Sequence, residues 1–193
     1  MKKLYFFTFF ILFFSFLSLA DNKIMEIIDG KKDAKINLIV YESLTCSHCA
    51  SFHTEIYPLL KENFIDKGII NLEFRNFPLD IAALNASKIA HCRNDGSSKI
   101  LHLLYKKQKD WVKGNSIEDF NENLEKLIKS ENLNLNFKNC INNTNIEDYI
   151  LKDRIDAVQK YNINATPTLI IMGKKFDKTL TYKNIKKAIE KLI

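Results

Sequence analysis

Two cysteines, Cys46 and Cys49, are separated by two residues, and this C-x-x-C spacing has the clearest chemical meaning in the sequence. The pair follows an apolar run of β-strand type, residues 36–41, and opens a segment with helical periodicity. At a helix N-terminus, unpaired backbone N–H groups and the helix dipole stabilise an anion, which favours the thiolate of the first cysteine. A strand, a C-x-x-C pair and a helix in this order indicate thiol–disulfide exchange.

His48, which lies between the two cysteines, indicates the direction of that exchange. We expect Cys46 to be the nucleophile and Cys49 to be the sulfur that resolves a mixed disulfide. A partly cationic imidazole at His48 favours the Cys46 thiolate. Because a thiolate of low pKa stabilises the reduced dithiol, the pair is expected to give its disulfide away, as an oxidant does.

Two other interpretations of these cysteines are a metal site and a purely structural disulfide. Cys46, His48, Cys49 and His53 could supply metal ligands. A C-x-x-C pair is only half of a closed zinc site, however, and no second cluster in the sequence completes it. We therefore expect no metal and no other cofactor.

Thr166-Pro167 stands immediately before an apolar strand segment, residues 168–172. A proline at this place removes a hydrogen bond from the sheet, so its presence needs a geometric reason. In the thioredoxin architecture the corresponding loop faces the C-x-x-C pair and its proline is cis. With the cysteines upstream and a closing helix downstream, we expect a cis bond before Pro167 and include Thr166 and Pro167 in the site.

The first twenty residues predict a secretory signal peptide. Lys2 and Lys3 precede an apolar stretch, residues 4–19, and small residues precede a cleavage point after Ala20. The alternative is an uncleaved N-terminal anchor that tethers the protein to the membrane, since the stretch is near the lower limit for spanning a bilayer. In both cases the working domain is expected in the periplasm, where disulfides persist.

Charge and the isolated histidines suggest little further chemistry. The formal net charge is +6, and the densest basic run, within residues 106–109, is followed by Asp110. This interleaving is typical of a solvated helix face, so no nucleic-acid partner is expected. His91 and His102 are likewise expected to be solvated on helix surfaces.

The order of the expected elements predicts an α/β fold. A helix at 49–63, kinked at Pro58, connects two strands that should pair in parallel through a right-handed crossover. The expected strands cover residues 24–28, 36–42, 69–74, 168–172 and 175–176. The other expected helices cover residues 81–92, 99–109, 117–129, 146–161 and 182–193.

This order predicts a thioredoxin-like fold with an inserted all-helical subdomain. The thioredoxin-like domain comprises residues 21–80 and 161–193, and the helical insert comprises residues 81–160. No dimerisation domain is evident in the sequence, so we expect a monomer.

Three motifs together resemble the DsbA-type thiol:disulfide oxidoreductases. They are VYESLTCSHC at residues 40–49, RNFPLD at 75–80 and NINATPT at 162–168. The resemblance runs in order through nearly all of the chain after residue 20, including the helical insert. It implies a periplasmic oxidant whose substrates are exported cysteine-containing polypeptides, and reoxidation by a quinone-linked membrane partner of the DsbB type.

The resemblance also assigns roles by position. Cys46 is similar to the exposed nucleophile of the family, Cys49 to the buried partner, His48 to the tuning residue and Pro167 to the cis-proline.

Two positions depart from the family pattern. Ser47 stands where the best-known members have proline, which bears on the reduction potential. Many members carry an acidic residue six positions before the first cysteine, where this chain has Val40. Glu42 lies close by, but its neighbours predict a different orientation, so proton transfer at Cys49 is expected to differ from the family.

Cys92 and Cys140 lie 48 positions apart in the helical block and make the cysteine count even. We interpret them as a structural disulfide that fastens the insert, and some DsbA-like proteins are similar in having four cysteines. The alternative is a second redox relay, although these cysteines lack the C-x-x-C spacing and stand on separate helices.

The sequence therefore predicts an enzyme that donates the Cys46–Cys49 disulfide to exported proteins. A disulfide isomerase or reductase is one alternative, with which Thr166 before the proline is compatible. A periplasmic peptide-binding chaperone that acts without redox chemistry is another, and a copper- or zinc-handling protein is a third.

Overall fold

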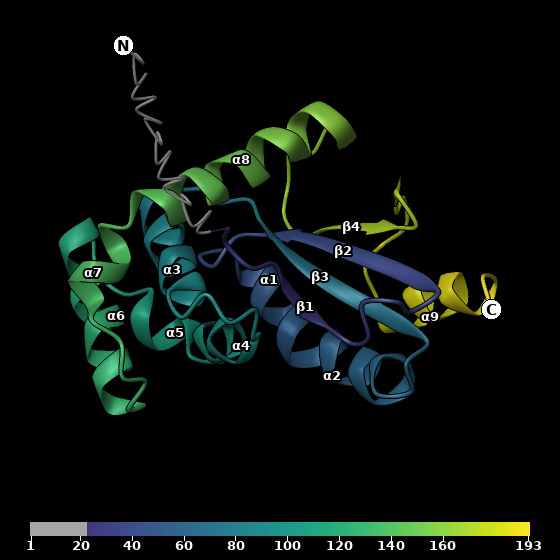
Figure 1. The fold of residues 1–193 in the computed structure, drawn as a ribbon, viewed down its shortest axis with the longest axis horizontal. Helices are drawn as coiled ribbons and strands as arrows, with labels where there is room; N and C mark the ends of the chain where they lie inside the picture. The colour runs from purple at the N-terminus through teal and green to yellow at the C-terminus, as the bar shows by residue number, and fades with distance from the viewer. Residues whose placement is uncertain (1–22) are drawn as a thin grey trace, which may run out of the picture.

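A mixed sheet of order β1-β3-β2-β4-β5 forms the centre of the molecule (Figure 1). The structure is a computed structural model that describes residues 23–193, and the predicted signal peptide at 1–20 lies outside them. β2 and β3 are parallel, as predicted, whereas β1 pairs antiparallel with β3 and β4 pairs antiparallel with β2 and β5. The strands are β1 Ile27–Asp29, β2 Ile36–Glu42, β3 Ile70–Asn76, β4 Thr168–Ile171 and β5 Lys174–Lys175.

The crossover from β2 to β3 is one helical run with two π-helical turns. It consists of α1 Ser47–Ser51, η1 Phe52–Ile56, α2 Tyr57–Leu60 and η2 Lys61–Ile65. Pro58 stands in the first turn of α2, directly after η1. Because proline lacks an N–H and crowds the preceding turn, it accounts for this wider turn, while the kink predicted at Pro58 stays a prediction.

The two faces of the sheet are covered by different helices (Figure 1). Successive residues of a strand point to opposite faces, so Leu38 and Val40 pack into the core beneath the crossover helix and α9, Tyr182–Glu190. Tyr41 packs on the other face, in a smaller cluster with residues of α8, Thr144–Tyr161.

The remaining helices gather at one end of the sheet, on the left in Figure 1. They are α3 Ile81–His91, α4 Lys99–Lys106, α5 Gln108–Trp111, α6 Ile117–Ser130 and α7 Phe137–Ile141. The helix predicted at 99–109 is therefore divided in two, and α7 was not predicted because five residues are too few to show a helical period.

Several helices begin where a side chain accepts a hydrogen bond from an otherwise unpaired backbone N–H. The capping residues are Asp80 of α3, Ser116 of α6, Asn136 of α7, Asn143 of α8 and Thr181 of α9. Asn162 ends α8 in the left-handed conformation, with φ of 50°, and turns the chain toward β4.

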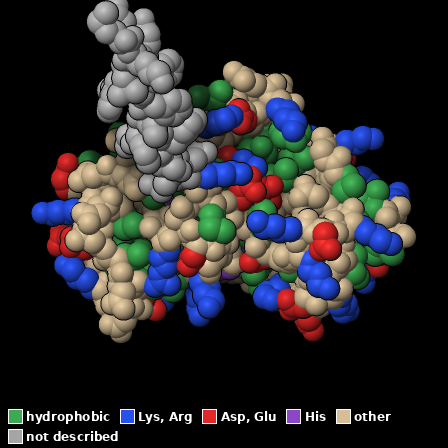
Figure 2. Space-filling model, in the orientation of Figure 1, with side chains coloured by type: hydrophobic (Ala, Val, Ile, Leu, Met, Phe, Trp, Pro, Cys, Tyr) green, Lys and Arg blue, Asp and Glu red, His purple; other side chains and the backbone are tan. Residues whose placement is uncertain are grey.

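Acidic and basic side chains are interleaved over the face seen in Figure 2. Lys106 and Lys109 are exposed, as expected of a solvated helix face. In the part of the chain that the structure describes, every helix is too short or too polar to cross a membrane.

Candidate active site

Cys46 and Cys49 lie at the start of the crossover helix, shortly after the end of β2. Cys46 is the N-cap residue of α1, and its half-buried side chain is reachable from solvent. Cys49, one turn into the helix, is 0% exposed. Both are free thiols, so the structure represents the reduced dithiol.

The surroundings of Cys46 stabilise its thiolate. A hydrogen bond from the Cys49 thiol makes the largest contribution, and although burial opposes it, the pKa of Cys46 falls to about 5. The side chain of Thr166 and the backbone N–H groups of His48 and Cys49 lower this pKa further. Anion-stabilising donors at a helix start therefore surround the reachable sulfur.

We expect the alkylation rate of Cys46 by iodoacetamide to follow this pKa. Only the thiolate reacts, so the rate should be constant above pH 6 and fall about tenfold per pH unit below a midpoint near 5. The same cysteine in guanidinium-unfolded protein is the control and should titrate near its ordinary pKa of about 8.5. A midpoint above about pH 7.5 in the folded protein would contradict this assignment.

Cys49 has the opposite character. Burial is the main cause that raises its pKa far above the ordinary value, and hydrogen bonding to Cys46 and the charge of Glu42 add to it. At any physiological pH the reduced protein therefore holds a thiolate at Cys46 and a protonated thiol at Cys49.

The loop before β4 faces the nucleophile. The Cys46 sulfur lies 3.4 Å from the Thr166 carbonyl oxygen, and the bond between Thr166 and Pro167 is cis. Thr166 Oγ1 is buried and has no hydrogen-bond partner among the described residues, which leaves its hydroxyl free to donate to the Cys46 thiolate. Segments 120 positions apart in the sequence are thus joined in one site.

His48 contributes to this site through its backbone N–H, and its side chain is exposed. Action of the imidazole itself on Cys46 stays a prediction. Among residues 23–193, no group of three or more His, Cys, Asp and Glu side chains is arranged to hold a metal ion. His53 points instead at a carboxylate, since its Nε2 lies 2.6 Å from Glu42 Oε2.

The orientation predicted for Glu42 is wrong. Residues two apart on a strand share a face, so Glu42 projects on the same side of β2 as Val40, toward the cysteine-bearing helix. Its side chain is buried, which raises the pKa of Glu42 well above its ordinary value, and the charge of Cys46 raises it further. This chain therefore has a buried acid beside the dithiol, two positions later than the family pattern.

His102 departs from the prediction of a simply solvated side chain, because it is only partly exposed and both of its ring nitrogens have protein partners. Its Nδ1 lies 2.8 Å from His53 Nδ1, and its Nε2 lies 3.1 Å from Asp29 Oδ2. Burial lowers the pKa of His53 to about 3, so that imidazole is neutral. The sequence indicated His53 only as a metal ligand and His102 only as a solvated residue, and it gave no sign of Asp29, because 49 or more positions separate His102 from each partner.

His91 also departs from the prediction of a solvated side chain, since it is 2% exposed. Its Nε2 lies 3.1 Å from the amide nitrogen of Asn76, which also donates to Asp153 at 2.9 Å. Burial lowers the pKa of His91 to about 4, so the ring is neutral. This histidine fastens α3 to β3 and α8.

The helical insert holds the active-site turn from outside. Gln108 of α5 donates to the backbone carbonyls of Leu44 and Cys46, at 2.8 and 3.0 Å. Thr45 donates to the Asp80 carboxylate at 2.8 Å, at the start of α3. The insert therefore positions the turn that carries the nucleophile.

Cys92 and Cys140 are bonded to each other, with Cα atoms 5.3 Å apart. Cys92 follows α3 and Cys140 belongs to α7, so the bond joins two helices of the insert. Cys140 is 1% exposed, which shields its sulfur from attack by other thiols.

Comparison with known proteins agrees with this site. A family model described as thioredoxin matches residues 22–191. Disulfide bond formation protein D of Bacillus subtilis (strain 168) is 30% identical over 171 residues, which cover 84% of this chain and 74% of that protein. A relative of protein-disulfide oxidoreductase type from Rickettsia bellii (strain RML369-C) is 27% identical over 172 residues. The match covers 87% of this chain, which spans 64% of the length of that relative.

Solved structures share the fold. Wolbachia pipientis alpha-DsbA1 superposes with a TM-score of 0.77 at 30% identity, over 86% of this chain and 90% of that one. Oxidised BdbD of Bacillus subtilis superposes with a TM-score of 0.73 at 26% identity, over 86% and 92%. The predicted thioredoxin-like fold with a helical insert and a C-x-x-C pair is confirmed. Within that class, the chain belongs to the DsbA-like branch of the thioredoxin family.

Proposed function

We propose that this protein is a periplasmic thiol:disulfide oxidase that donates its Cys46–Cys49 disulfide to cysteine pairs of exported polypeptides. The observation that carries the proposal is the contrast between the two sulfurs. The reachable Cys46 has a pKa lowered to about 5, whereas that of the buried Cys49 is strongly raised. A thiolate stabilised in the reduced state makes the disulfide a better oxidant.

Oxidation of a substrate proceeds through two thiol–disulfide exchanges. A substrate thiolate attacks Cys46 Sγ, the bond from Cys46 to Cys49 breaks, and its electron pair leaves on Cys49, which takes up a proton. A second substrate thiolate then attacks the substrate sulfur of the mixed disulfide and releases Cys46 as a thiolate. The substrate loses two electrons and gains a disulfide, and the enzyme is reduced. His48, Thr166 and Pro167 act beside Cys46, and Thr166 stabilises the departing thiolate.

An exposed apolar surface beside the nucleophile supports an unfolded polypeptide as substrate. Leu79 and Ile81 are 48% and 64% exposed and flank Asp80, which binds Thr45 next to Cys46. A polypeptide that has not yet folded exposes apolar side chains, which such a surface can contact.

The compartment and partners follow from the N-terminus and the family. A signal peptide at residues 1–20 directs export, and the protein acts as a monomer. Its domains are residues 21–80 with 161–193, and the helical insert 81–160. A quinone-linked membrane partner of the DsbB type restores the Cys46–Cys49 disulfide, while the Cys92–Cys140 bond is structural.

The test is the equilibrium reduction potential of the Cys46–Cys49 pair in glutathione buffers, followed by alkylation and mass spectrometry. We expect a value of about −120 to −180 mV, which is the range of oxidants and isomerases. Refolding of a substrate with scrambled disulfides, run in parallel, should be slower than oxidation of the reduced substrate. A potential of about −250 mV or below would contradict the oxidase and favour a reductase.

A further inference from the structure

Four titratable side chains form a continuous hydrogen-bonded chain that leads away from the dithiol. Glu42 Oε2 lies 2.6 Å from His53 Nε2, and His53 Nδ1 lies 2.8 Å from His102 Nδ1. His102 Nε2 lies 3.1 Å from Asp29 Oδ2. Each imidazole uses both of its nitrogens, so the chain has no gap between the two carboxylates.

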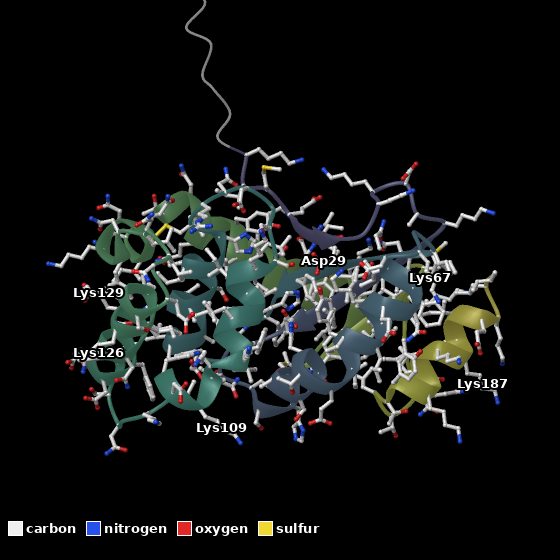
Figure 3. The ribbon with its side chains drawn as sticks, turned by 90° about the horizontal axis from the view of Figure 1, so that it is seen from below. Asp29, Lys67, Lys109, Lys126, Lys129 and Lys187 are labelled. Atoms are coloured by element: carbon white, nitrogen blue, oxygen red, sulfur yellow. A yellow bond between two sulfur atoms is a disulfide. The ribbon has the colours of Figure 1, made fainter. Side chains whose placement is uncertain are left out.

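One end of this hydrogen-bonded chain is buried, and the other end is partly exposed to solvent. The side chains of Glu42 and His53 are 3% and 1% exposed, whereas those of Asp29 and His102 are 19% and 22% exposed. Asp29 belongs to the edge strand β1 and is labelled near the middle of the view in Figure 3, between Lys129 on the left and Lys67 on the right. The partly exposed end, formed by Asp29 and His102, therefore lies between β1 and α4, away from the surface around Cys46.

The aromatic rings around the two histidines fix their planes. Tyr105 stacks on His53 with centroids 3.9 Å apart, and Tyr57 stacks on His102 at 4.1 Å. The Tyr57 hydroxyl also donates to Asp29 Oδ2 at 2.7 Å. Burial raises the pKa of both tyrosines, so neither phenol ionises and interrupts the chain.

Cys49 needs such a connection. Each time the Cys46–Cys49 bond breaks, a thiolate forms at a sulfur that is 0% exposed, and each time the bond re-forms a proton must leave. Glu42 Oε1 is buried and has no hydrogen-bond partner among the described residues, and the charge of Glu42 acts on Cys49. A carboxyl whose charge acts on the thiol is a suitable group to exchange a proton with it, directly or through one water.

We propose that Glu42, His53, His102 and Asp29 form a proton relay between the buried Cys49 sulfur and solvent at the β1–α4 surface. The inference rests on the proposed exchange at the C-x-x-C pair and identifies its proton route. Glu42 gives its carboxyl proton to the Cys49 thiolate and receives the Nε2 proton of His53. His53 receives the Nδ1 proton of His102 at its own Nδ1, and His102 receives at Nε2 a proton that Asp29 takes from water. One proton moves from solvent to sulfur, and neither imidazole gains or loses a proton overall; reoxidation runs the route in reverse.

The charges along the chain fit this route. Burial raises the pKa of Glu42, so that carboxyl is the proton donor, and burial keeps His53 neutral. At the other end burial acts to raise the pKa of Asp29. Hydrogen bonds from His102, whose Nε2 carries the proton once the transfer is complete, and from Tyr57 and Ser98 outweigh burial and keep this carboxylate ionised in the reduced protein. The hydrogen-bonded chain therefore carries a transferable proton on Glu42, at the end near the sulfur, and a negative charge on Asp29, at the end near solvent.

The test separates the two steps of reoxidation by glutathione disulfide, with acid quenching and mass spectrometry. In the first step the Cys46 thiolate forms a glutathione adduct; in the second, Cys49 loses its proton, attacks Cys46 and releases glutathione. The variant is His102→Gln, whose amide can hydrogen-bond but does not pass a proton as imidazole does. We expect the second step to slow roughly a hundredfold near neutral pH, as for loss of a general acid–base group, and the first step to be unchanged.

Lys106→Gln is the matched control. Lys106 lies on the same helix as His102 but is exposed and outside the relay, so Lys106→Gln leaves every atom of the relay in place and both steps should keep their rates. Free imidazole should restore the second step of His102→Ala, because His102 is reachable from solvent. The second step of the unsubstituted protein should also slow in heavy water.

A second step of His102→Gln at the unsubstituted rate would overturn the relay, as would equal slowing of both steps. If His102→Gln does not fold, as judged by far-UV circular dichroism, Asp29→Asn and the heavy-water measurement decide in its place. Failure of the unsubstituted protein to form the Cys46 adduct would instead overturn the proposed function, so the two failures are distinguishable.

Discussion

Replacement of Cys49 with serine is expected to leave the protein able to form mixed disulfides with its substrates but unable to release them. Cys46 loses the hydrogen bond from the Cys49 thiol but keeps the backbone N–H groups at the start of α1 that stabilise its thiolate. Cys49 is the sulfur that would attack Cys46 and free a bound partner. When the variant is given a substrate cysteine already oxidised with glutathione, Cys46 attacks the substrate sulfur and glutathione leaves as a thiolate. The mixed disulfide between Cys46 and the substrate should therefore accumulate until it accounts for most of the variant, and turnover should fall to the uncatalysed rate.

The trap is detected as a shifted band on non-reducing gels and located by mass spectrometry of peptides that contain residue 46. The matched control is Cys46→Ser, in which the remaining thiol at Cys49 is 0% exposed and its pKa is strongly raised. This control should form no mixed disulfide. Adducts on Cys49 in Cys46→Ser, at yields like those of Cys49→Ser, would show that the two sulfurs have the opposite roles.

The parts of the fold that the sequence predicted correctly are those written in local patterns. The apolar run of β2, the C-x-x-C pair and the helix after it are contiguous, so their order alone predicts a strand, a turn and a helix start. Strand β4 after Pro167 is equally local. The parallel pairing of β2 and β3 follows because the crossover between them is long enough to return the chain to the same edge.

The surroundings of the histidines could not be predicted from local sequence patterns. His102 depends on Asp29, 73 positions away, and on His53, 49 positions away, and no local pattern records such distances. An isolated histidine on a helix has the same sequence signature whether water or a second imidazole faces it. The misplacement of Glu42 was avoidable, since a period of two puts it on the face of Val40.

Removal of the Cys92–Cys140 bond is expected to produce the largest loss of stability. The bond closes a loop of 48 positions, and the chain-entropy estimate for a loop of this length is about 4 kcal/mol. For a domain of this size, that loss corresponds to a melting temperature lower by roughly 10 °C. Urea unfolding and differential scanning calorimetry of Cys92→Ala/Cys140→Ala, each compared with the unsubstituted protein, measure both quantities.

The same double variant distinguishes a structural bond from a second redox relay. The bond joins α3 to α7 within the insert, whereas Gln108 of α5 holds the active-site turn. A structural role therefore predicts that the alkylation midpoint of Cys46 and the potential of the Cys46–Cys49 pair change little while stability falls. A redox relay predicts the reverse: Cys92 and Cys140 would become reduced during turnover, and their replacement would slow it. Because Cys140 is 1% exposed, we expect the bond to stay intact through every cycle, and mass spectrometry of quenched reactions checks this.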